Sequence, residues 1–277
     1  MPELPEVETV VRTLEHLIKG STIEKIDIFY DKLIDNVSVE SFTKMMKSQT
    51  FHHFKRIGKY LIFEMDDYNL VVHLRMEGKF YVNDIGSDYD QKHTHSIFYL
   101  SNGKQLEYHD TRKFGRMYIY PKSEDITTVS AFKNVGYDAF DERVSAEYLY
   151  EMSRNRKTTL KQFLLDQSVM AGVGNIYADE ICFRCGFRPE TKVYRLTKKD
   201  FANIVDATRI ILRGAIKAGG TTIRSYTSSL GVDGRFQLQL KVHGKSREKC
   251  QVCGTVIEKT KVGGRGTYYC KKCQRRK

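Results

Sequence analysis

The chain begins Met1-Pro-Glu-Leu-Pro-Glu-Val-Glu8, and this stretch predicts both the start of a helix and a reactive chain terminus. Apolar residues recur at helical spacing from Val7 onward, and Gly20 follows them as a stop signal. If Met1 is removed, Pro2 becomes a free secondary amine. An α-amino group has an ordinary pKa of about 7.7–8.0, so roughly a tenth of it is unprotonated at neutral pH. Pro2 is therefore a candidate nucleophile.

Glu3 and Glu6 place carboxyl groups next to that amine, where they can donate and accept protons. The simpler interpretation is that they are first-turn acids, each stabilising the helix dipole by about 0.3–1 kcal/mol. The residues alone favour this simpler interpretation. Nearby carboxylates also favour the protonated amine, so a catalytic Pro2 needs a cation or an apolar environment to offset them.

A second motif is Cys250-x2-Cys253-x16-Cys270-x2-Cys273. Four thiolates at this spacing are typical of a tetrahedral structural site, so we expect one bound Zn²⁺. So short a segment needs the metal to fold. Disulfides are the alternative, and they are rare in the cytoplasm. A zinc ribbon with no role in nucleic-acid binding is a further alternative.

Positive charge is concentrated in the same region. The net charge is +12, and residues 241–277 carry +10 of it. Such a basic segment is typical of nucleic-acid binding and argues against the plain zinc ribbon, although a merely solvated tail has the same composition. Two strands are predicted at about 256–260 and 267–269. They put Arg265 at a hairpin tip, where its guanidinium suits a phosphate.

The composition is that of a globular protein with room for two domains: 277 residues, 40% hydrophobic and 29% charged. It contains no run of about 18 apolar residues. No signal-peptide pattern follows the start, so we expect a cytoplasmic location.

The chain changes character near residues 130–145. Before this region, alternating patterns predict strands at about 22–30, 50–56, 59–65, 69–75, 95–100, 105–109 and 114–120. Many short strands favour a β-sandwich or barrel. After it, helices are predicted at about 145–155, 158–166, 175–185 and 197–218. The fold class is therefore α+β.

The helical half holds a run that looks like a helix-two-turns-helix. Thr159-Leu-Lys-Gln-Phe-Leu-Leu-Asp166 is followed by Gly172-Val-Gly-Asn-Ile-Tyr-Ala-Asp-Glu180. We expect Asn175 to cap the second helix, whose N-terminus then suits a phosphate. The start Met1–Glu6 and the run Gly172–Glu180 resemble the formamidopyrimidine-DNA glycosylase and endonuclease VIII family, in its formamidopyrimidine branch. The resemblance extends through most of the chain.

The resemblance implies a bifunctional DNA glycosylase and abasic-site lyase that acts in base excision repair as a monomer on double-stranded DNA. Its substrates would be oxidised purines such as 8-oxoguanine and formamidopyrimidines. Pro2 would attack the sugar C1′ and form a Schiff base, followed by β- and δ-elimination. Glu3 would protonate the sugar ring oxygen, and Glu6 would organise the site.

The resemblance also implies three domains. They are a catalytic β-sandwich with a flanking helix at 1–135, a helix-two-turns-helix domain with a lesion loop at 136–240, and a β-hairpin zinc finger at 241–277. Two alternatives stay open: an oxidised-pyrimidine glycosylase of the same family, which Leu4 argues against, and a non-catalytic zinc-ribbon DNA-binding protein.

Residues of the first half take roles from the same resemblance. Lys59 would lie beside Pro2 and a phosphate, although such a lysine is usually solvated. His73 would contact a phosphate, although a satisfied histidine within a sheet explains it as well. His93 would contact DNA, in a segment where Thr94 replaces the family's usual aspartate. Three further residues would fill the gap that a flipped base leaves, although without the resemblance a core methionine and a core phenylalanine are the simpler interpretation: Met76, Arg112 and Phe114.

Residues of the second half also take roles. Arg156 and Lys161 match basic family positions that face DNA. Thr222 to Tyr226 belong to a Gly- and Ser-rich segment that the family uses to cover the flipped purine. Arg265 joins the catalytic group as the phosphate contact of the zinc finger.

Overall fold

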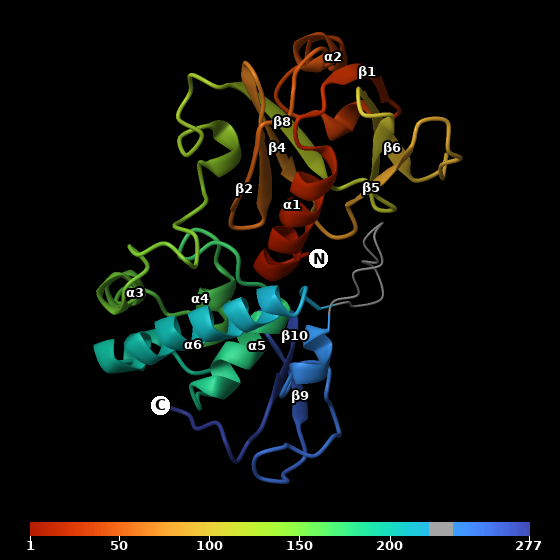
Figure 1. Cartoon of the computed structure of the whole chain (residues 1–277). Coiled ribbons are helices and arrows are strands. Elements are labelled where there is room, and N and C mark those ends of the chain that lie inside the picture. Colours follow the sequence, from red (N-terminus) through yellow and green to blue (C-terminus); the bar gives the residue numbers. More distant parts are fainter. Residues whose placement is uncertain (222–234) are drawn as a thin grey trace. The chain divides into compact units, whose positions relative to one another are not determined.

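The computed structural model describes residues 1–221 and 235–277, which form two compact units (Figure 1). Unit 1 comprises Met1–Lys133 together with Thr221, and unit 2 comprises Asn134–Gly220 and Arg235–Lys277. The division into three domains stays a prediction. Within the described ranges, no helix combines the length and the apolar character that crossing a bilayer requires.

Unit 1 is a sandwich of two antiparallel four-stranded sheets, which confirms the predicted β-sandwich. One sheet has the order β1 (Ile23–Ile28), β6 (Thr94–Leu100), β7 (Lys104–His109), β5 (Lys79–Asp84). The other has the order β2 (His53–Ile57), β3 (Tyr60–Glu64), β4 (Tyr68–His73), β8 (Arg116–Pro121). The flanking elements are α1 (Leu4–Ile18), α2 (Val39–Met46) and the 3-10 turns η1 (Asp31–Leu33) and η2 (Ser130–Phe132).

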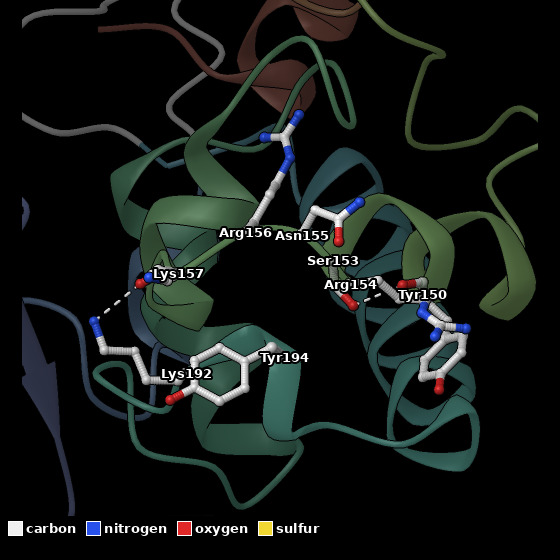
Figure 2. A pocket seen from close by; sticks show the side chains of 8 residues that line it. All are labelled: Tyr150, Ser153, Arg154, Asn155, Arg156, Lys157, Lys192 and Tyr194. Carbon is white, nitrogen blue, oxygen red and sulfur yellow. Dashed lines mark hydrogen bonds between the residues drawn. The ribbon is translucent and has the colours of Figure 1, made fainter.

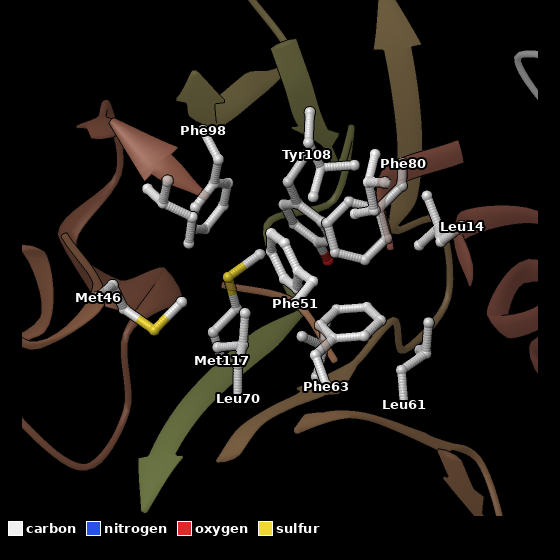
Figure 3. Packing of buried hydrophobic residues seen from close by; sticks show 14 of the residues in the cluster. Leu14, Met46, Phe51, Leu61, Phe63, Leu70, Phe80, Phe98, Tyr108 and Met117 are labelled. Carbon is white, nitrogen blue, oxygen red and sulfur yellow. The ribbon is translucent and has the colours of Figure 1, made fainter. Parts of the chain in front are cut away.

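The core of unit 1 lies between its two sheets. Figure 3 shows Phe63 and Met117 from one sheet meeting Phe80 and Tyr108 from the other. The Phe80 and Tyr108 rings contact edge to face at 5.3 Å between centroids, a favoured aromatic geometry. Helix α1 adds Leu14 to this core, because its apolar stripe faces the strands. The stripe fixes the position of the chain start on the sandwich.

Unit 2 holds four α-helices and a hairpin among its described residues. The helices are α3 (Ala146–Ser153), α4 (Leu160–Leu165), α5 (Asn175–Arg184) and α6 (Lys198–Lys217), with 3-10 turns η3 (Val193–Arg195) and η4 (Phe236–Gln239). The hairpin pairs β9 (Glu258–Val262) with β10 (Arg265–Tyr269). The two-residue turn needs a positive φ twice, and Gly263 and Gly264 supply +56° and +75°. Together with unit 1, these elements confirm the α+β class.

Candidate active site and metal site

The chain start is fixed by a capping box at the head of α1. Glu3 is the N-cap, and its side chain accepts a hydrogen bond from the Glu6 backbone. In return the Glu3 amide donates to Glu6 Oε2 at 2.9 Å. Both acids and Pro2 are buried. Glu3 and Glu6 can therefore act both as first-turn acids of α1 and as neighbours of the chain terminus, because the bonds that cap α1 also hold Pro2 in place.

Glu6 also connects the chain start to a residue far along the sequence. Its second oxygen, Oε1, accepts the Thr221 amide at 2.8 Å and the Thr221 hydroxyl at 2.9 Å. These donors satisfy the hydrogen-bonding capacity of the buried carboxylate. Thr221 is the last described residue before 222–234, so the predicted contacts Thr222 and Tyr226 lie outside the described residues.

Lys59 directly precedes β3, and His73 ends the neighbouring strand β4 of the same sheet. Lys59 is buried in the turn between β2 and β3, and Tyr60 after it pairs with His73. Burial, then the positive charges of Arg75 and Lys59, lower the pKa of His73 to about 3. His73 Nδ1 accepts the Arg75 amide at 2.9 Å, which leaves the proton of the neutral ring on Nε2. His73 is therefore an uncharged donor, and its phosphate contact stays a prediction.

The loop that carries Arg112 and Phe114 is organised by Asp110, which the sequence did not single out. Asp110 Oδ1 accepts the Arg112 amide at 2.9 Å, and Oδ2 accepts the amides of Phe114 and Gly115 at 2.8 Å each. Phe114 is 48% exposed as a residue, and the Arg112 guanidinium lies over its ring at 4.7 Å from the centroid. This exposure rules out a core role for Phe114 and leaves an apolar ring available for insertion.

Two glycines bring the Met76 loop next to this one. A Cβ on Gly78 would lie 2.3 Å from the Tyr108 hydroxyl oxygen, and one on Gly115 would lie 1.6 Å from the same atom. Only glycine permits both approaches. Half-buried Met76 is thus presented from a loop that packs on the same tyrosine as the Phe114 loop.

The segment His93-Thr94-His95, in which Thr94 replaces the family's usual aspartate, takes part in a polar network. The carbonyl of half-buried His93 accepts the Asp110 amide at 3.0 Å. Thr94 Oγ1 lies 3.0 Å from His109 Nε2, which also lies 2.8 Å from Glu107 Oε2. The threonine hydroxyl thus takes a place in a hydrogen-bonded chain. No histidine cluster suited to a metal occurs within the described ranges.

Asn175 does not cap α5, which corrects the sequence prediction. The helix begins at Asn175, and its N-cap is Gly174. The Asn175 side chain instead donates to the Gly266 carbonyl at 3.2 Å. It therefore supports the hairpin that presents Arg265, which is exposed and directly follows the turn.

The prediction that Lys161 faces DNA is wrong. Its side chain is 0% exposed. Its ammonium donates to Asp179 Oδ1 at 2.8 Å, to the Gly266 carbonyl at 2.8 Å and to Thr267 Oγ1 at 2.9 Å. These three acceptors match the three protons of the ammonium, so Lys161 ties α4, α5 and the hairpin together. Arg156, in contrast, is half-buried and pairs with Asp166 at 2.5 Å.

We expect Lys161→Met to lower the free energy of local unfolding of α5 and the hairpin by about 3–5 kcal/mol, because the buried Asp179 carboxylate loses its lysine partner. That carboxylate keeps contacts to His243 and the Tyr268 amide on the other oxygen alone. Native-state hydrogen exchange of the zinc-loaded protein measures this directly. Lys199→Met, at an exposed position of α6, is the control and should change nothing. A loss below about 1 kcal/mol in Lys161→Met would contradict the buried-pair account.

The four cysteines form a metal site of the predicted kind. Their sulfur atoms all lie within 4.8 Å of one another, with Cys250 to Cys273 at 3.8 Å and Cys253 to Cys270 at 3.4 Å. A tetrahedral zinc with Zn–S bonds of about 2.3 Å needs sulfur atoms about 3.8 Å apart. The cysteines therefore fit one structural zinc, which would hold the two ends of the hairpin segment together.

Cys253→Ser is expected to lose the zinc and most DNA affinity, because three thiolates bind zinc far more weakly than four. Unit 1 should stay folded, since none of its residues belongs to the cluster. Metal analysis and a duplex-binding titration measure the two losses. Cys185→Ser removes a thiol outside the cluster and should keep both properties. Active protein without zinc would overturn the assignment.

Comparison with known proteins identifies the family. Family models match residues 1–117 (formamidopyrimidine-DNA glycosylase N-terminal domain), 135–227 (its H2TH domain) and 247–276 (zinc finger found in FPG and IleRS). The chain is 44% identical to formamidopyrimidine-DNA glycosylase of Bacillus cereus over 277 residues, covering 100% of both chains. It is 45% identical to that of Oceanobacillus iheyensis over 275 residues, covering 99% of this chain and 98% of the relative.

Solved structures agree. Lactococcus lactis Fpg in complex with DNA containing an abasic site superposes with a TM-score of 0.91 at 38% identity, over 99% of this chain and 100% of that one. A mutant of the same protein with Fapy-dG DNA gives 0.92 at 37% identity, with coverage of 99% and 100%. The one structural zinc and the sequence resemblance are thereby confirmed. This chain belongs to the formamidopyrimidine-DNA glycosylase family of base excision repair enzymes.

Proposed function

We propose that this DNA glycosylase excises oxidised purines, namely 8-oxoguanine and formamidopyrimidines, from double-stranded DNA and then cleaves the strand at the abasic site. Its solved relatives hold DNA with an abasic site or with Fapy-dG, which are a product and a substrate of this reaction. The enzyme acts as a monomer in the cytoplasm.

One observation carries the proposal: the Glu6 carboxylate accepts hydrogen bonds from the Glu3 amide and from the amide and hydroxyl of Thr221, and these bonds fix the chain start. A terminal amine is normally mobile, and a nucleophile must be held in a near-attack geometry. Here the residue after Pro2 caps a helix that packs on the sandwich core. The chain therefore positions its second residue with the rigidity of an interior side chain.

The proposed chemistry starts when removal of Met1 frees the Pro2 nitrogen. Its lone pair forms a bond to C1′, and the bond from C1′ to the base breaks, with the electron pair leaving on the base. The attached nitrogen passes its proton to the departing base, which restores the nitrogen lone pair, and Glu3 donates a proton to the sugar ring oxygen as the ring opens to the iminium. Loss of a C2′ proton then breaks the C3′–O bond, and a second elimination breaks the C5′–O bond. Glu6 organises the site through its contacts with Glu3 and Thr221.

The cations of unit 1 support this chemistry. Lys59 and Arg75 both add positive potential at His73. A positive surrounding of this kind offsets the flanking acids and favours the unprotonated amine of Pro2. His73 donates through Nε2–H to a phosphate, and His93 adds a further DNA contact.

DNA is held by residues of both units. Met76, Arg112 and Phe114 fill the gap left by the flipped nucleotide. Arg156, Asn175 and Arg265 face the sugar-phosphate backbone, as do backbone amides near Asn175 at the start of α5. The segment from Thr222 to Tyr226 covers the extruded base.

Single-turnover excision from matched duplexes tests the lesion class. The duplexes carry 8-oxoguanine, a formamidopyrimidine or thymine glycol at the same position. We expect the two purine lesions to be released at least about tenfold faster than the oxidised pyrimidine, a difference of about 1.4 kcal/mol in the barrier. Faster release of thymine glycol would assign the chain to oxidised pyrimidines.

A further inference from the structure

Unit 2 contains an open pocket of about 720 Å³, and of its lining residues Arg156 also has a proposed DNA contact. It lies where the end of α3, the loop toward α4 and the turn η3 come together (Figure 2). Four cations and two aromatic rings line it: Arg154, Arg156, Lys157, Lys192, Tyr150 and Tyr194. Pockets of roughly 300–1,000 Å³ commonly hold small organic ligands.

The charge of this pocket is unbalanced. The described residues that line it include no acidic side chain. Among the described residues, Arg156 is the lining cation that pairs with a carboxylate, that of Asp166. The Lys192 ammonium donates to the Lys157 carbonyl at 3.0 Å, which joins two chain segments without neutralising either lysine. Like charges gathered at one opening repel each other, and an anion bound between them removes that repulsion.

The aromatic rings add a second kind of contact. Figure 2 shows Lys192 and Tyr194 on one side of the opening and Arg154 and Tyr150 on the other. Tyr194 is 49% exposed as a residue, and the Arg154 guanidinium lies over the Tyr150 ring at 5.8 Å from the centroid. Exposed aromatic faces beside cations are how proteins hold single nucleotides, because the base stacks while the phosphate pairs.

We propose that this pocket binds a nucleoside phosphate, with the phosphate between Lys157 and Lys192 and the base against Tyr194. The unit that it recognises is a phosphate ester attached to a base. A free mononucleotide or the end of a DNA strand supplies the same chemistry. The assignment stands apart from lesion excision, because it needs neither a damaged base nor the amine of Pro2.

The test uses the full-length, zinc-loaded protein and 2′-deoxyguanosine 5′-monophosphate as the probe, with deoxyguanosine and inorganic phosphate as partial ligands. Calorimetric titration compares the wild type with Lys157→Gln/Lys192→Gln. The control is Lys44→Gln/Lys47→Gln, which removes the same charge from exposed positions in unit 1. We expect the nucleotide to bind the pocket variant at least tenfold more weakly than it binds either other protein. Tyr194→Ala should weaken binding of the nucleotide but leave binding of inorganic phosphate unchanged.

A second arm distinguishes the source of the nucleotide. Undamaged duplexes with blunt ends or with a single-stranded overhang are titrated at several salt concentrations. A loss confined to overhang duplexes in the pocket variant, with a salt slope lowered by about two, identifies a DNA end as the ligand. A loss confined to the free nucleotide identifies a soluble ligand. Protection of Lys157 and Lys192 from acetylation by the nucleotide checks the site in the unaltered protein. Equal binding of all probes by the pocket variant and the control, without protection of either lysine, would overturn the proposal.

Discussion

A chain that retains Met1 is expected to lose base excision and strand cleavage by at least about a thousandfold, since the nucleophile is then absent. Acylation by Met1 turns the Pro2 nitrogen into a tertiary amide with no available lone pair. DNA binding should be little affected, because the Met1 side chain is 46% exposed and the capping box begins at Glu3. Unprocessed protein, made with methionine removal blocked during expression, is compared with processed protein in single-turnover assays.

Pro2→Gly is the matched variant for this comparison. It keeps a free terminal amine but replaces the secondary amine by a primary one, so we expect reduced rather than absent lyase activity. N-terminal mass determination establishes which chain start each sample carries. Equal cleavage rates for the unprocessed and processed proteins would remove Pro2 from the mechanism.

Phe114→Ala is expected to slow 8-oxoguanine excision from duplex DNA about thirtyfold, while cleavage at a preformed abasic site changes much less. Flipping a stacked base costs a few kcal/mol, and an apolar wedge that recovers about 2 kcal/mol accounts for this factor. At an abasic site no base has to be unstacked. Arg112→Ala should behave similarly and should also alter which base is accepted opposite the lesion, because we propose that its donors reach that base's pairing edge.

The comparison needs single-turnover rates on both substrates, with Arg265→Ala as the contrast. Arg265 is proposed to contact a phosphate, so its loss should weaken binding to all duplexes alike. It should also lower the slope of the logarithm of the binding constant against the logarithm of salt concentration by about one. Folding of the variants is checked through the Asp110 loop, whose amides should keep their hydrogen-exchange protection. Equal losses on both substrates in Phe114→Ala would show that this ring supports the fold or the chemistry instead.

Much of the fold could be predicted because its signals are local. The apolar stripe and the stop at Gly20 place α1 within a residue of its observed end, and Thr197 caps α6 as its position suggests. The cysteine spacing encodes the metal site by itself, since four thiolates at these intervals have few other uses. Two elements of unit 1 were not predicted from the sequence, α2 and β5. Helix α2 has apolar residues at helical spacing but is only 8 residues long, and β5 buries little more than Phe80, so each signal is short.

The site was harder to predict because its contacts are not local. Lys161 looks like any helical lysine, and its partners Asp179 and Thr267 lie 18 and 106 residues away. The link from Glu6 to Thr221 spans 215 residues. Asp110 did leave a signal, since aspartate before a turn commonly accepts backbone amides two residues on. Sequence patterns thus show which residues are unusual, but packing decides which of them reach solvent.

The central claim is that the terminal amine forms a covalent bond to the sugar, and borohydride reduction tests it most directly. Protein processed to Pro2 is mixed with duplex DNA carrying 8-oxoguanine, reduced, digested, and mapped by mass spectrometry. We predict one DNA adduct per protein on the N-terminal peptide, at the Pro2 nitrogen, and no adduct when Met1 is retained. An adduct on the peptide that contains Lys59, or an undiminished adduct with Met1 in place, would contradict the mechanism.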